Sequence, residues 1–204
     1  VNASNALLSY DYAVVLNDGG HGNGSQPYFH VEVVNGAGAV LSTCTQYYVQ
    51  ASAGVPPAGF VNSGQLAGSA PGAVYYLPWK SNSVNLTPYI GQSVTARFTA
   101  AGCTQGGHFG YAYIDASCGP AQILTSNVNP CIGTNAVLTA PAVAGGTYSW
   151  SGPGIVGATN GQTVTVNANG TYSVTVTPAQ GPGCAYALQI TVTFVSLNAP
   201  LATS

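Results

Sequence analysis

Residues 10–33 read YDYAVVLNDGGHGNGSQPYFHVEV, and this stretch decides the fold class. Two runs rich in Val, Tyr and Phe, at 9–16 and 28–34, flank a segment of Gly, Asn, Ser and Pro. The first kind of residue favours strands, and the second kind favours turns. The pattern predicts two β-strands joined by a loop.

The same pattern continues along the chain, and helical periodicity is absent. No stretch of about 11 residues has apolar positions at a helical spacing, and 27 Gly and 13 Pro interrupt the sequence. Further strands are predicted at 46–50, 74–77, 83–86, 93–99 and 109–115. A second series is predicted at 136–140, 147–151, 162–166, 171–177 and 187–195.

Short strands at this spacing, bounded by turn residues, are typical of β-sandwiches. Gly-Pro at 119–120 and Asn-Pro at 129–130 would break any strand, so the domain boundary is expected between 118 and 130. We predict an all-β chain with one sandwich over 1–118 and a smaller one over 119–195. Residues 196–204 would be a linker or the start of a next repeat.

Charge is nearly missing from this chain. Asp, Glu, Lys and Arg make up 3% of residues, whereas 46% are hydrophobic, which is enough apolar surface for a folded core. Lys80 and Arg97 are the only Lys or Arg residues, so binding to a nucleic acid backbone is excluded. No apolar run approaches the ~18 residues that would span a bilayer. A near-neutral surface repels its own copies little, so neighbouring copies or other domains of the same protein are the expected partners.

Cysteine spacing indicates disulfides. Five cysteines are present, none in a C-x-x-C pair, at positions 44, 103, 118, 131 and 184. Disulfides imply an oxidising, extracellular location, and an odd count leaves one cysteine over. The chain opens at Val1 without an export signal, so we expect any signal to be removed or to lie outside this segment.

Three pieces of the first predicted domain carry a resemblance to a known family. They are the 10–33 stretch, YLPWKSNSVNLTPYIGQSVTARFTAAGC at 76–103 and GGHFGYAYIDASC at 106–118. Together they resemble a jelly-roll module of large adhesin-like bacterial surface proteins. Such proteins often end in a gliding-motility-associated domain, and the family implies export by the type IX secretion pathway.

The second predicted domain resembles the PKD-like or immunoglobulin-like repeats that follow such modules. The segments are NPCIGTNAVLTAP at 129–141, GGTYSWSGPG at 145–154, NGTYSVTV at 169–176 and GCAYALQITV at 183–192. The resembling repeats commonly tie their first and last segments together, which implies a Cys131–Cys184 bridge. In the first domain we expect Cys44–Cys103, with Cys118 left over. The resemblance implies a structural and adhesive segment of a large surface protein or filament.

Catalytic signatures are missing. The sequence has no nucleophile elbow, H-E-x-x-H motif or P-loop, and its only carboxylates are Asp11, Asp18, Glu32 and Asp115. We therefore predict a protein that is not an enzyme.

Asp18 and Asp115 are candidate calcium ligands. Asp18 opens a Gly- and Asn-rich loop whose carbonyl oxygens suit Ca²⁺, and Asp115 ends a predicted strand. Jelly-roll modules that this domain resembles often hold a structural Ca²⁺ with an aspartate of the final strand. The alternative is that Asp18 makes an Asx-turn and Asp115 caps its strand.

Two histidines stand in matching Gly-Gly-His sequences, at His21 and His108. Imidazoles from two loops can meet to bind zinc, with Asp18 or Cys103 as a third ligand. The alternative is that both are hydrogen-bonded structural residues.

Aromatic pairs are the last candidate site. Members of a neighbouring pair point to opposite faces of a strand, so one member of Tyr47-Tyr48 and of Tyr75-Tyr76 is at least partly exposed. We select Tyr48, Tyr76 and Trp79 as possible contact residues. They would pack against an adjoining copy or stack polysaccharide rings, the second giving a carbohydrate-binding module; the alternative is ordinary burial with the hydroxyl in water.

Overall fold

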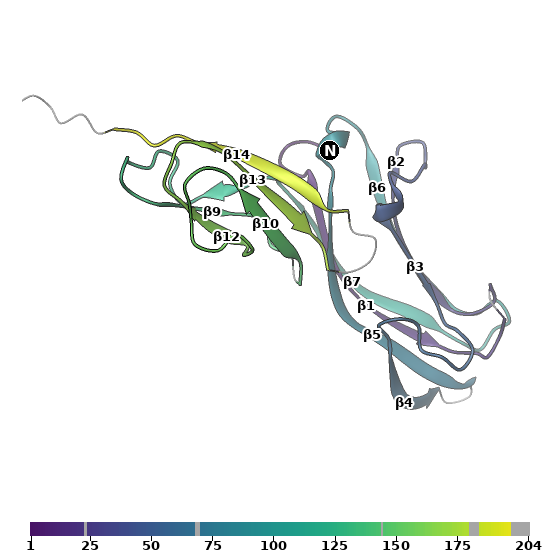
Figure 1. The fold of residues 1–204 in the computed structure, drawn as a ribbon. Coiled ribbons are helices and arrows are strands. Elements are labelled where there is room, and N and C mark those ends of the chain that lie inside the picture. The colour runs from purple at the N-terminus through teal and green to yellow at the C-terminus, as the bar shows by residue number, and fades with distance from the viewer. Residues whose placement is uncertain (23, 68–69, 144, 180–183, 197–204) are drawn as a thin grey trace, which may run out of the picture. The chain divides into compact units, whose positions relative to one another are not determined.

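The computed structural model describes residues 1–22, 24–67, 70–143, 145–179 and 184–196, and its regular structure is almost entirely β (Figure 1). The contacts divide the chain into two units. The first is Val1–Pro120 with Ala179–Cys184, and the second is Ala121–Pro178 with the residues from Ala185 onward. The prediction of an all-β chain built from sandwiches is confirmed. Of the linker expected at 196–204, residues 197–204 lie outside the described residues.

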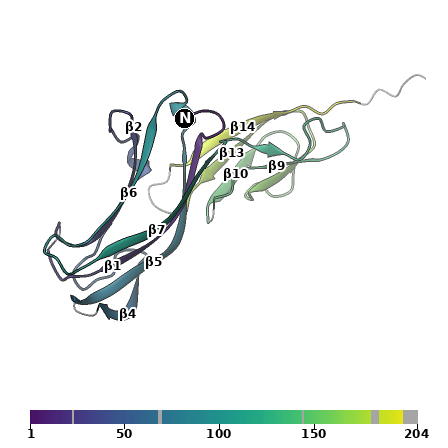
Figure 2. The same cartoon turned by 180° about the vertical axis from the view of Figure 1, so that it is seen from behind.

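The first unit pairs a four-stranded sheet with a three-stranded sheet, both antiparallel (Figure 2). The sheet orders are β4-β5-β1-β7 and β3-β2-β6. The strands are β1 (Leu7–Asn17), β2 (Tyr28–Asn35), β3 (Gln46–Gln50), β4 (Val61–Ala67), β5 (Ala70–Asn85), β6 (Val94–Ala101) and β7 (Gly110–Gly119). Two single-turn 3-10 helices, η1 (Thr43–Thr45) and η2 (Thr87–Tyr89), complete this unit.

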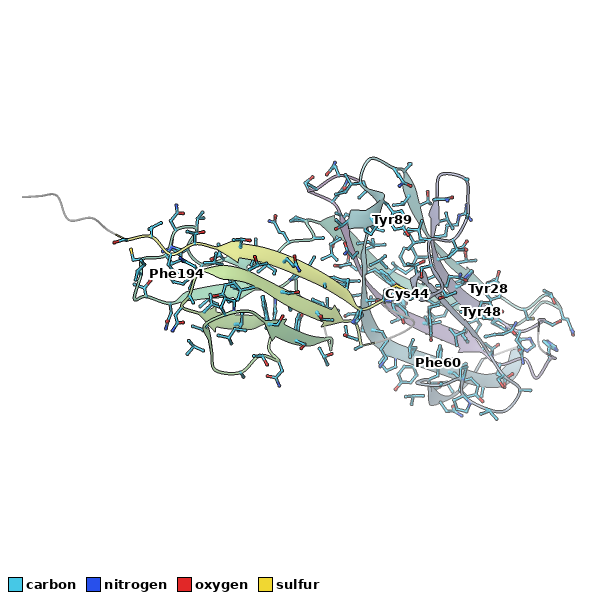
Figure 3. The ribbon with its side chains drawn as sticks, turned by 45° about the horizontal axis from the view of Figure 1, so that its top comes forward. Tyr28, Cys44, Tyr48, Phe60, Tyr89 and Phe194 are labelled. Atoms are coloured by element: carbon cyan, nitrogen blue, oxygen red, sulfur yellow. A yellow bond between two sulfur atoms is a disulfide. The ribbon has the colours of Figure 1, made fainter. Side chains whose placement is uncertain are left out.

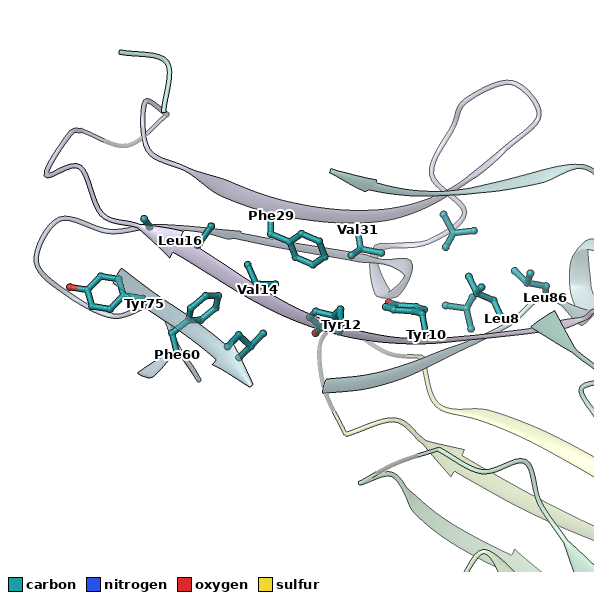
Figure 4. Close-up of a cluster of buried hydrophobic side chains, with 14 residues drawn as sticks. Leu8, Tyr10, Tyr12, Val14, Leu16, Phe29, Val31, Phe60, Tyr75 and Leu86 are labelled. Atoms are coloured by element: carbon teal, nitrogen blue, oxygen red, sulfur yellow. The ribbon is translucent and has the colours of Figure 1, made fainter. Parts of the chain in front are cut away.

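Alternate side chains of β1 build the core between these sheets. Tyr10, Tyr12, Val14 and Leu16 point inward and are almost fully buried. The ring of Tyr12 stacks on Phe29 of β2 with centroids 5.5 Å apart, which joins the two sheets through the centre (Figure 4). Burial of this kind contributes roughly 1.5–3 kcal/mol per large apolar side chain.

One long strand, β5, replaces the two strands predicted at 74–77 and 83–86. Its register against β1 shifts between Tyr12 and Val14, so Pro78 and Trp79 together lie opposite Ala13. Proline cannot donate to a ladder, and a bulge accommodates it without ending the strand. Strand β4, which reads VNSGQLA, was not predicted because it lacks a run of β-forming residues.

The second unit has sheets ordered β10-β13-β14 and β11-β12-β9-β8. Its strands are β8 (Leu124–Thr125), β9 (Ala136–Thr139), β10 (Thr147–Ser151), β11 (Ile155–Val156), β12 (Thr163–Val166), β13 (Gly170–Thr177) and β14 (Tyr186–Val192). Buried Trp150 donates from Nε1 to the Gly161 carbonyl at 2.8 Å, and buried Tyr172 donates to the Ala168 carbonyl at 2.5 Å. Both rings fill the core while their polar atoms are satisfied.

No helix in the described part of the chain is long and apolar enough to cross a membrane.

A disulfide joins Cys44 of η1 to Cys184, with 5.2 Å between their Cα atoms (Figure 3). Cys184 precedes β14 and belongs to the first unit by its contacts. The predicted bridges Cys131–Cys184 and Cys44–Cys103 are therefore wrong. Cys103, Cys118 and Cys131 are not in disulfides.

Strand registers explain why the predicted bridges fail. The backbone of Cys131 forms an isolated β-bridge with Val195, beyond the far end of β14. Cys184 precedes the start of that strand. Cys103 follows Ala101, which pairs with Tyr28 at the start of β2. Cys44 comes just before Gln46, which pairs with Glu32 farther along β2. Each expected pair is thus separated by most of a strand.

Peptide mapping of the unreduced protein should find the Cys44–Cys184 linkage, because their Cα spacing lies in the range that disulfides require. Mass spectrometry after alkylation should label Cys103, Cys118 and Cys131 without prior reduction. Recovery of a Cys131–Cys184 peptide instead would contradict this pairing.

Candidate functional site

The outer face of the four-stranded sheet carries a group of exposed aromatic side chains. Alternate residues of a strand share a face, so Tyr111 and Tyr113 of β7 point the same way. Their partners on β1 are the small residues Val15 and Ala13. Tyr111 and Tyr113 are 43% and 59% exposed, and their rings meet edge to face at 5.8 Å.

Strand β5 supplies a second aromatic row on the same face. Tyr76 pairs with Val15 and is therefore on the side of Tyr111. Trp79 lies in the bulge and is 59% exposed. We call Tyr76, Trp79, Tyr111 and Tyr113 the aromatic face. Its two rows are two strand spacings apart, roughly 10 Å, with small β1 side chains between them.

A hollow of about 350 Å³ beside Trp79 adds polar groups to this face. It is lined by Asp11, Trp79, Ser81 and Asp115. Asp11 is the direct cross-strand partner of Asp115 on one side and of Ser81 on the other. The site therefore combines an indole with two carboxylates that can accept hydrogen bonds.

These carboxylates have no ion-pair partner among the described residues. The one ion pair there joins Arg97 to Glu32 at 3.2 Å, on the other sheet. Like charges directly opposite one another destabilise a sheet, so Asp11 and Asp115 carry a cost that a ligand with hydrogen-bond donors would offset.

Tyr48, the third predicted contact residue, lies elsewhere. It belongs to β3 of the other sheet, is 55% exposed and stacks on Tyr28 with ring centroids 5.5 Å apart (Figure 3). Its ring also meets His30 at 5.8 Å. The structure thus groups Trp79 and Tyr76 but separates Tyr48 from them.

The expectation that Asp18 and Asp115 share a calcium ion is wrong. Asp115 pairs with Asp11, and Asp18 follows β1 seven residues further along. At about 3.3 Å per residue the two aspartates are on the order of 20 Å apart, too far for one ion.

Asp18 is instead a buried organiser of the β1–β2 connection. Its Oδ1 accepts from the Gly20 backbone at 2.9 Å and from Gln26 Nε2 at 2.7 Å. Its Oδ2 accepts from the Gly54 backbone at 2.6 Å. The hydrogen bond from Gly20 forms the Asx-turn that was the alternative to a calcium site. The bonds from Gln26 and Gly54 compensate the buried charge of the carboxylate.

His21, His108 and Cys103 lie together, so Cys103 rather than Asp18 is in the place of the third zinc ligand. His21 Nε2 is 3.2 Å from His108 Nδ1, and Cys103 Sγ is 3.3 Å from the same nitrogen. Desolvation raises the pKa of the Cys103 thiol, but hydrogen bonds with His108 and the nearby backbone lower that pKa below its ordinary value overall. The thiolate is the form of cysteine that binds metals.

Sequence reasoning left Tyr111, Tyr113 and Asp11 out of the selected residues. The alternation in YAYID at 111–115 already places both tyrosines and Asp115 on one face. The position of Asp11 opposite Asp115 depends on strand order, which alternation does not contain.

No protein-family model, curated protein or solved structure matches this chain.

Replacing Asp18 with Asn should destabilise the first unit by about 1–3 kcal/mol, because an amide cannot accept all three hydrogen bonds that the carboxylate accepts. Asp115→Asn is the matched control. It removes a cross-strand repulsion and should stabilise by roughly 0.2–1 kcal/mol. Urea unfolding measures the change in the free energy of unfolding for both variants, which should be opposite in sign. An Asp18→Asn protein as stable as the wild type would refute the role of Asp18 in holding the β1–β2 connection.

Proposed function

We propose that this chain is a structural and adhesive segment of a large secreted bacterial surface protein, acting as a spacer and as a contact surface. The bacterial source, gliding motility and type IX export rest on the family that the quoted segments resemble. The Cys44–Cys184 disulfide supports an extracellular location, since disulfides persist in oxidising compartments.

The aromatic face is the observation that carries the adhesive role. Scattered exposed aromatics are ordinary, but Tyr76, Trp79, Tyr111 and Tyr113 occupy one side of one sheet. Tyrosine and tryptophan supply large contact areas at low entropic cost, because each has few rotatable bonds. Strands hold them in fixed positions, so a partner meets a prepared surface.

Neighbouring copies of the protein are the partners that the charge composition favours. With a formal net charge of −2 over 204 residues, two copies repel each other weakly at the distances where contacts form. The aromatic face of one copy would then bury its rings on a neighbour. The cost of such a contact is the desolvation of Asp11 and Asp115.

Self-association of the purified chain should therefore weaken by roughly tenfold or more in a Trp79→Ala, Tyr113→Ala double variant. Asp115→Asn should strengthen it, because a neutral side chain costs less to bury. Sedimentation velocity across a concentration series measures both effects. Tyr48→Ala, which removes an equally exposed ring from the other sheet, is the control, and an equal loss in that variant would refute the assignment of the face.

A carbohydrate-binding module is the second candidate, and the hollow beside Trp79 favours it. An indole can stack on the apolar side of a sugar ring while Asp11, Asp115 and Ser81 hydrogen-bond to its hydroxyls. Here the carboxylates contribute to binding, whereas in a contact between copies they oppose it.

The Asp115→Asn variant consequently distinguishes the two candidate functions, because it should strengthen self-association but weaken binding to a polysaccharide. If polysaccharide is the ligand, Trp79→Ala should reduce binding about tenfold, and Asp115→Asn should weaken it as well, because a charge-assisted hydrogen bond is lost. Affinity electrophoresis through gels containing neutral polysaccharides, chosen from a glycan array, measures this. Binding that survives Trp79→Ala would exclude the hollow as the sugar site.

A further inference from the structure

Two loops at one end of the first unit converge on three metal-binding side chains. His21 comes from the connection between β1 and β2, and Cys103 and His108 come from the connection between β6 and β7. Their candidate ligand atoms all lie within 4.8 Å of one another. None of the three contributes to the aromatic face, so this cluster is independent of the proposed adhesive function.

The spacing of the ligand atoms is close to that of a tetrahedral zinc site. With Zn–N near 2.0–2.1 Å and Zn–S near 2.3 Å, adjacent nitrogens are about 3.3 Å apart, and a nitrogen and a sulfur are about 3.6 Å apart. His21 Nε2 and His108 Nδ1 are 3.2 Å apart, and Cys103 Sγ is 3.3 Å from His108 Nδ1. The separation of His21 from Cys103 is at most 4.8 Å and would shorten by about 1.2 Å or less, and Cys103 and His108 would move apart by about 0.3 Å.

Hydrogen bonding satisfies part of this arrangement, because the Cys103 thiol donates to the Gly106 carbonyl at 3.1 Å. His108 Nδ1 has two close neighbours, His21 Nε2 and Cys103 Sγ. A ring nitrogen of a neutral histidine offers either one proton or one lone pair. In a network of hydrogen bonds, His108 Nδ1 must therefore share that one proton or lone pair between His21 Nε2 and Cys103 Sγ. A metal ion would accept a lone pair from every one of the three atoms.

The loop that carries His21 is held in place before any ion binds. Buried Gln26 donates from Nε2 to the His21 carbonyl at 3.1 Å and to Asp18 Oδ1 at 2.7 Å. The two loops are also joined directly, because the Thr104 backbone donates to the Ser25 carbonyl at 3.2 Å. Supporting bonds of this kind orient metal ligands and contribute to affinity.

Gly19 forms the floor beneath both imidazoles. A Cβ at this position would come within 2.5 Å of His108 Nδ1 and 2.7 Å of His21 Cδ2. The rings approach the backbone this closely only because residue 19 has no side chain. His21 and His108 meet at a ring-centroid distance of 4.9 Å as a result.

We propose that His21 Nε2, Cys103 Sγ and His108 Nδ1 bind a borderline divalent transition-metal ion, with Zn²⁺ as the ion that fits this donor set. Two imidazoles and a thiolate suit Zn²⁺ and are poor ligands for Ca²⁺ or Mg²⁺, which require oxygen. Three protein ligands leave a fourth position open to water or to a group from a partner.

Cobalt titration of the purified chain, with its disulfide intact, tests the proposal. Co²⁺ should produce thiolate-to-metal charge-transfer absorption that saturates at one equivalent, and Zn²⁺ should abolish it by displacement. Cys103→Ser should remove the band, and His21→Ala should weaken Co²⁺ binding by roughly 100-fold or more, beyond the effect of losing a supporting residue.

Matched controls are available in the same chain. Cys118→Ser removes an exposed thiol outside the cluster, and His30→Ala removes the histidine that contacts Tyr48; both should bind like the wild type. Gly19→Ala keeps every ligand but displaces both rings, so it should weaken binding while circular dichroism shows a folded protein. Absence of a band, a band that survives Cys103→Ser, or unchanged binding by Gly19→Ala would overturn the proposal.

Discussion

Strand β1 hydrogen-bonds to β5 on one side and to β7 on the other, and the alternation from Leu8 to Leu16 assigns these side chains to the core or to the outer face. Tyr12 goes inward to Phe29, and its neighbour Asp11 goes outward to Asp115. A slip of one residue in β1 would exchange the two sets, burying the Asp11 carboxylate and exposing Tyr10 and Tyr12. Core and contact surface therefore depend on the same register.

Much of the fold could be predicted from composition and turn residues alone. Gly and Pro limit strand length, and Val, Tyr and Thr mark where strands run, so β1, β2 and β6 were expected close to their observed bounds. The strands predicted at 74–77 and 83–86 left Pro78 in the gap between them, whereas the bulge at Pro78 lets β5 continue past it. The disulfide depended on which strand ends meet, and that is a property of topology rather than of spacing.

The candidate sites divide along the same line. Exposure of one ring from each tyrosine pair follows from a period of two, and Tyr76 obeys it. Which exposed rings share a face does not follow, so Tyr48 was grouped with Trp79 although they lie on different sheets. The paired Gly-Gly-His sequences named both histidines of the cluster, and only the meeting of two loops selects Cys103 over Asp18 as the third member.

The Cys44–Cys184 bond has a mechanical consequence for a protein that is pulled. Tension that enters the chain before Cys44 and leaves it after Cys184 passes through the sulfur atoms and bypasses the covalent loop, which spans a sequence separation of 140 residues. Fully extended, that length of chain would reach roughly 480 Å. While the disulfide is intact, the chain between Cys44 and Cys184 cannot be extended, so most of β3–β13 bears no tension along its backbone. Reduction would turn a short, stiff link into a long extensible one, and the redox state of the surroundings would set its compliance.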